Sequence, residues 1–125
     1  MRRVMNSALP AAVLLGLAAA ATPPAALAAP QDGNWSVLIV TEKGDCDRGY
    51  RYSVNVSNGR VSYRGDASVD LDGTVEPNGA VKVSIRFGKQ GASGTGRLTE
   101  NSGVGTWRGR GSTGACAGRW EAERR

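Results

Sequence analysis

Apolar and polar residues alternate in short segments along most of the sequence after residue 34, and this period of two constrains the fold more than any other feature. The stretch from Val81 to Phe87 shows it most clearly, because every second residue there is apolar. Such alternation predicts a half-buried β-strand, with one face on a core and the other in water. No segment carries a convincing helical period. We therefore expect an all-β protein.

Short turns separate the predicted strands. Asn58-Gly59 is the strongest two-residue hairpin signal in the chain, and Pro77-Asn78-Gly79 is a second turn. Eight strands are predicted, at residues 35–41, 50–57, 60–64, 69–76, 80–87, 92–99, 103–109 and 114–123. Because every connection is short, sequence neighbours should pair antiparallel as a meander. Eight such strands predict an up-and-down barrel, which removes exposed sheet edges. A two-sheet sandwich is the alternative.

The segment Gly103–Trp120 should complete the barrel. It is rich in glycine, yet it also carries Trp107, Cys116 and Trp120. Glycine inside a strand usually marks a sharp bend or a close backbone approach. We expect the last three strands to curl, with the two tryptophans filling the space that the glycines leave. This closing hairpin should meet the first strand.

The two cysteines predict a disulfide. Cys46 follows the first predicted strand and Cys116 begins the last, so a bridge would join the strands that must meet on closure. It would close a loop of about 70 residues, a gain of roughly 4 kcal/mol on the chain-entropy model. Disulfides are typical of exported proteins. We therefore expect an oxidising compartment.

The N-terminus predicts a signal peptide over residues 1–28. Met1-Arg2-Arg3 is basic, Val13–Ala21 is apolar, and Ala26-Leu27-Ala28 is a small-x-small cleavage site. A retained anchor is the alternative. Cleavage would leave a single domain over residues 29–125, periplasmic or secreted in a bacterium and without an integral membrane segment. We expect it to be a monomer.

The charged residues argue against several functions. Removing Arg2 and Arg3 leaves 14 basic against 11 acidic residues, a milder excess than nucleic-acid binders usually show. The chain has no histidine, the commonest general base and metal ligand. Asp70 and Asp72 could imitate a glycosidase pair, but outward acids on a solvated strand are commoner. We expect a non-enzymatic protein without a metal or cofactor, and arginines that form a solvated outer face.

The chain resembles the calycin barrels, which include lipocalins, avidins and small bacterial relatives. Gly33-Asn34-Trp35 at the start of the first strand and Arg119 in the last carry the resemblance. It implies that Trp35 closes one end of the barrel and that Arg119 packs over its ring by a cation–π contact. An eight-stranded barrel is filled by side chains or holds one small ligand. We expect a small apolar or aromatic ligand near Tyr52, Trp107 and Trp120.

The chain also resembles bacterial periplasmic inhibitors of lysozymes and metalloproteases, which are small disulfide-closed barrels. By this resemblance Ser93-Gly94 would enter an enzyme's cleft, with Arg108 or Arg110 assisting. An inhibitor of a host or envelope enzyme is therefore the alternative function. Its binding end should carry the longer loops, since binding residues concentrate on loops held by a rigid frame. These loops span residues 42–49, 65–68, 88–91 and 110–114. A structural envelope protein without a discrete ligand is a third possibility.

Overall fold

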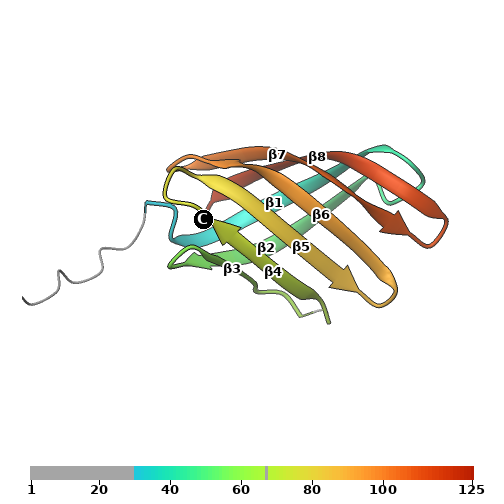
Figure 1. Cartoon of the computed structure of the whole chain (residues 1–125), viewed down its shortest axis with the longest axis horizontal. Coiled ribbons are helices and arrows are strands. Elements are labelled where there is room, and N and C mark those ends of the chain that lie inside the picture. The colour runs from blue at the N-terminus through green and yellow to red at the C-terminus, as the bar shows by residue number, and fades with distance from the viewer. Residues whose placement is uncertain (1–29, 67) are drawn as a thin grey trace, which may run out of the picture.

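The computed structural model describes residues 30–66 and 68–125, and the predicted signal peptide lies outside them. Eight strands form one closed antiparallel barrel, in which each strand pairs with its sequence neighbours and β8 pairs with β1 (Figure 1). The strands are β1 (Gly33–Lys43), β2 (Gly49–Ser57), β3 (Arg60–Tyr63), β4 (Asp70–Val75), β5 (Ala80–Phe87), β6 (Gln90–Leu98), β7 (Ser102–Gly111) and β8 (Gly114–Arg124). The predicted up-and-down barrel is confirmed, and closure excludes the two-sheet sandwich.

Tight turns set the register of two hairpins at one end of the barrel. Asn58 and Gly59 both have positive φ, 52° and 76°, as the two central residues of a type I′ turn require. At the next hairpin Gly79 has φ 91°, and its N–H donates to the carbonyl of Glu76. Both asparagine–glycine turns were predicted, because these residues adopt left-handed conformations at little cost.

The first and last strands close the barrel. The pairing of β1 with β8 runs from Trp35 opposite Arg124 to Lys43 opposite Ala117, with a bulge between Thr41 and Lys43. The predicted disulfide joins Cys46 to Cys116, with 6.1 Å between their Cα atoms. The covalent bridge therefore lies at the end of the barrel where the bulge interrupts the β1–β8 ladder.

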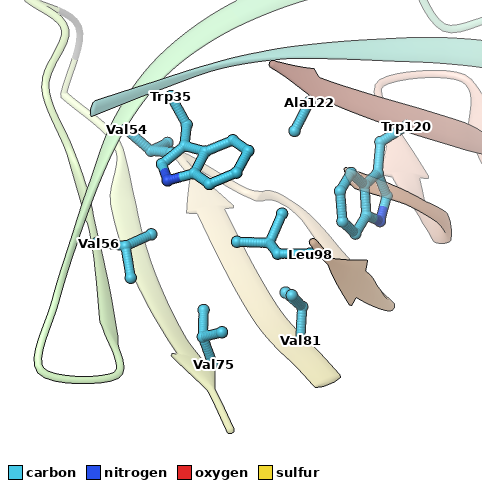
Figure 2. Close-up of a cluster of buried hydrophobic side chains, with 8 residues drawn as sticks. All are labelled: Trp35, Val54, Val56, Val75, Val81, Leu98, Trp120 and Ala122. Atoms are coloured by element: carbon cyan, nitrogen blue, oxygen red, sulfur yellow. The ribbon is translucent and has the colours of Figure 1, made fainter. Parts of the chain in front are cut away.

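The core fills one end of the barrel, the end opposite the disulfide. Its buried side chains come from six strands and are drawn in Figure 2: Trp35, Val54, Val56, Val75, Val81, Leu98, Trp120 and Ala122. Trp35 is 1% exposed, and its indole N–H donates to the Gln31 carbonyl at 2.9 Å. The predicted role of Trp35 in closing one end of the barrel agrees with this position.

The basic residue over Trp35 is Arg124, which corrects the prediction of Arg119. The Arg124 guanidinium carbon lies 4.8 Å from the centroid of the Trp35 ring. Inward positions of β8 alternate through Cys116, Trp120 and Ala122, and Arg124 continues that alternation. Arg119 has the opposite parity, is exposed, and pairs with Glu42 at 3.2 Å on the outer wall. The strand's period of two therefore decides which arginine reaches the ring.

Glycines in β6 and β7 make room for Trp120. A Cβ added at Gly96 or Gly105 would meet both the Trp120 ring and a backbone carbonyl of the neighbouring strand, inside van der Waals contact. The prediction that a tryptophan fills the space left by the glycines is therefore confirmed for Trp120. It lets three adjacent strands bend tightly around one large side chain.

Candidate ligand cavity

A cavity of about 480 Å³ occupies the barrel between the core and the disulfide end. Inward side chains near the core are buried, whereas inward residues nearer the disulfide, such as Ile39, Leu71 and Ile85, are only half-buried. Phe87, the last inward residue of β5, is 50% exposed. The interior is therefore hollow and opens at the disulfide end.

One wall of the cavity is aromatic. Tyr50 and Tyr52 follow each other on the inner face of β2, with ring centroids 6.1 Å apart. Tyr63 of β3 meets Tyr52 edge to face, at 6.0 Å between centroids. Burial raises the pKa of the Tyr52 hydroxyl, and the neighbouring Tyr50 and Tyr63 add to this effect. Tyr52 therefore presents a neutral phenol to the cavity at physiological pH.

Trp107 and Trp120 contribute to the cavity from β7 and β8. Both indole N–H groups are already bonded: Trp107 donates to the Val40 carbonyl at 3.0 Å, and Trp120 donates to the Thr95 carbonyl at 3.2 Å. The Val40 bond is made just before the β1 bulge, where the ladder to β8 is interrupted. Because their polar atoms are occupied, the two tryptophans offer the cavity carbon surface.

The structure brings the three predicted ligand residues into one cavity. Tyr52, Trp107 and Trp120 all line it, and Trp120 also belongs to the core, at 7% exposed. The prediction omitted much of the aliphatic lining, including Leu71, Val83 and Ile85. Alternation marks these residues as inward. It does not distinguish a residue that packs in a core from one that faces an empty lumen.

Polar groups at the cavity are concentrated at its mouth. Asp47, Gln90 and Arg110 contribute to the lining there. The loop that carries Asp47 is fixed to the barrel, because the buried Thr41 hydroxyl donates to the Asp47 carbonyl at 2.6 Å. The disulfide fixes the same loop to β8. The mouth therefore has a rigid rim on this side.

The residues predicted for an enzyme-inhibiting surface lie mainly on the outer wall. Ser93 of β6 is directly opposite Arg108 of β7, and Gly94 is opposite Trp107. Ser93, Gly94 and Arg108 line a shallow depression of about 430 Å³. Arg110 lies nearer the mouth and borders the main cavity, to which Ser93 and Gly94 also contribute. Arg108 borders the depression only, so no single hollow is lined by all four residues.

Within residues 30–66 and 68–125, no three His, Cys, Asp or Glu side chains are close enough to hold a metal ion. The same residues include no helix that could cross a bilayer.

No family model, curated protein or solved structure matches this chain. The eight-stranded antiparallel barrel nevertheless fits a calycin-like barrel in its general form. Its disulfide is typical of an oxidising environment.

Proposed function

We propose that this protein binds one small apolar or aromatic molecule inside its barrel, without transforming it. The observation that carries the proposal is the hollow interior of about 480 Å³, open at one end. Small-molecule sites typically measure about 300–1,000 Å³ and are lined by apolar side chains with a few polar groups. This cavity has that size and that distribution of polarity.

The lining favours a ligand with an apolar body. Its deep part is formed by aliphatic and aromatic carbon, and its two tryptophan N–H groups are bonded to the backbone. The neutral Tyr52 phenol is suited to donating a hydrogen bond or stacking on a ring. Any charged group of the ligand would remain at the mouth, beside Asp47 and Arg110, where water can still solvate it.

A pair of variants on β5 tests the proposal. Val83 faces the lumen and the next residue, Ser84, is exposed on the outside. Val83→Phe should fill part of the cavity and weaken binding of the neutral fluorophore N-phenyl-1-naphthylamine by about tenfold or more, whereas Ser84→Phe should not. Circular dichroism checks that both variants fold. Competition by fatty acids of graded length and by aromatic acids then identifies the ligand class.

Two results would overturn the proposal. One is a wild-type protein that binds neither the fluorophore nor any competitor at millimolar concentration. The other is equal loss of binding in Val83→Phe and Ser84→Phe, which would place the fluorophore outside the lumen.

Inhibition of an enzyme remains the second candidate function. Ser93 and Gly94 lie in the middle of β6, paired on both sides, so they cannot enter a deep cleft as a protruding loop would. The loops at the disulfide end are better placed for that contact. Inhibition assays against lysozymes and metalloproteases, with the wild type and an Arg108→Ala, Arg110→Ala double variant, distinguish the two functions.

A further inference from the structure

The outward side chains of β5, β6 and β7 form a surface that carries positive charge only. None of these three strands contains an aspartate or a glutamate. Their exposed outward residues include five cations, interleaved with serine and threonine hydroxyls. We call this surface the basic face, and it comprises Lys82, Ser84, Arg86, Ser93, Thr95, Arg97, Val104, Thr106, Arg108 and Arg110.

The cations of the basic face lack carboxylate partners in the described part of the chain. The two ion pairs of the described residues join Arg60 to Asp72 and Arg119 to Glu42, and neither involves the basic face. Acidic residues do border the face on both sides. Asp70 of β4 is opposite Arg86, and Glu121 of β8 is opposite Val104. Neither carboxylate forms an ion pair with a residue of the basic face. The positive charge therefore remains available to an external anion.

The register spaces these cations regularly. Arg86 and Arg110 are both opposite Gly91, so they lie two strands apart, at about 10 Å. Arg108 and Arg110 are alternate residues of β7, about 7 Å apart along the strand. Such an array matches a chain of repeated anionic groups better than a single small anion.

A depression runs from this face toward β1. Across the sheet, Ser93 is opposite Arg108, Arg108 is opposite Ala117, and Ala117 is opposite Lys43. Ala117 has a short side chain between the longer Arg108 and Lys43. The depression of about 430 Å³ includes all three residues in its lining. Ser93, Thr95 and Thr106 also line it, and so does Glu42, whose carboxylate is paired with Arg119. With that carboxylate neutralised by Arg119, the hydroxyls and the cations of Lys43 and Arg108 suit a sugar ring that bears an anionic group.

We propose that the basic face binds an anionic polysaccharide. The interleaved hydroxyls provide donors and acceptors for sugar hydroxyls, and the cations provide sites for carboxylate, sulfate or phosphate groups. Nucleic acid fits less well, because the face has no outward aromatic side chain for base stacking. A lipid surface also fits less well, because Val104 is the one large apolar residue there and nothing else would insert.

Two charge-matched triple variants test this proposal with the oxidised protein. The first replaces Lys82, Arg86 and Arg108 with glutamine, leaving Arg110 at the cavity mouth and the Arg97 bond to the Asn78 carbonyl intact. The second replaces Arg51, Arg64 and Arg125 with glutamine; all three are exposed, lie outside β5, β6 and β7, and take part in neither ion pair of the described residues. Both remove three positive charges. Affinities for heparin and polygalacturonate are measured by calorimetry at several salt concentrations.

The first variant should bind both glycans about tenfold more weakly than the wild type, with a smaller salt dependence, because three exposed charge contacts are lost. The second should change affinity less than about twofold. Equal losses of affinity in the two variants would show that net charge alone accounts for glycan binding, and would overturn the proposal. So would tighter binding to single-stranded DNA or to phosphatidylglycerol vesicles than to either glycan. Val83→Phe should leave glycan affinity unchanged, which separates this site from the cavity.

Discussion

The guanidinium of Arg124 stacks on the ring of Trp35, with 4.8 Å between its central carbon and the ring centroid. The same guanidinium donates to the carbonyls of Asp32 at 2.6 Å and Glu100 at 2.7 Å, and also to that of Pro30. One side chain thus fastens the N-terminal segment, the β6–β7 turn and the most buried tryptophan together. It closes the end of the barrel opposite the cavity mouth.

Replacing this arginine should destabilise the closed end. Arg124→Ala removes the cation–π contact and the charged hydrogen bonds, and should lower the free energy of unfolding by about 2–3 kcal/mol. Urea denaturation followed by circular dichroism measures the change. Arg125→Ala is the matched control, because the exposed Arg125 contributes its backbone N–H, which donates to the Asn34 carbonyl and survives substitution. Equal effects of the two changes would contradict this role for Arg124.

Loss of the disulfide should lower stability throughout the barrel. It links residues 70 positions apart, so the chain-entropy model gives a cost of about 4 kcal/mol for removing it. The Cys46→Ser, Cys116→Ser double variant should melt well below the oxidised wild type, and reductant should lower the wild type toward the same midpoint. The double variant itself should not respond to reductant. An unchanged midpoint would mean that β1–β8 pairing alone is sufficient for closure.

Alanine at Gly105 should strain the barrel. Its Cβ would collide with the Trp120 ring and the Thr95 carbonyl, neither of which can move freely. We expect Gly105→Ala to cost about 2–3 kcal/mol of unfolding free energy. Gly91→Ala is the control, because its Cβ would meet only the Ile85 carbonyl, at 3.4 Å. Thermal melts of the two variants give the comparison, and similar midpoints would show that Trp120 repacks without strain.

Tyr52 should make the protein less stable in alkali. Burial raises the folded-state pKa of this phenol above its ordinary value of 10.0, so the unfolded chain loses the proton first. The contribution of the neutral phenol is therefore complete below about pH 10 and is lost as pH rises through the folded pKa. Between pH 9 and 11 the melting temperature of the wild type should fall more steeply than that of Tyr52→Phe. Parallel pH profiles would contradict the effect of burial on Tyr52.

Local sequence rules predicted most of the fold. Each predicted strand boundary falls within two residues of the observed one. Alternation, asparagine–glycine turns and short connections act between residues close in the chain, so they can be recognised without a structure. The cysteine pairing was also predictable, because the chain has two cysteines and a closed meander brings the end of the first strand beside the start of the last.

The sequence determined the eight strands, their inward faces, the turns and the bridge, since each depends on local backbone preferences or on chain order. The tertiary structure decided three further features. It placed Arg124 rather than Arg119 over Trp35, because register and parity are set by the pairing of β1 with β8. It left the interior hollow near the disulfide, because cavity volume depends on how side chains from all strands meet. It also gathered arginines from separate strands onto one face, because lateral neighbours in a sheet are distant in sequence.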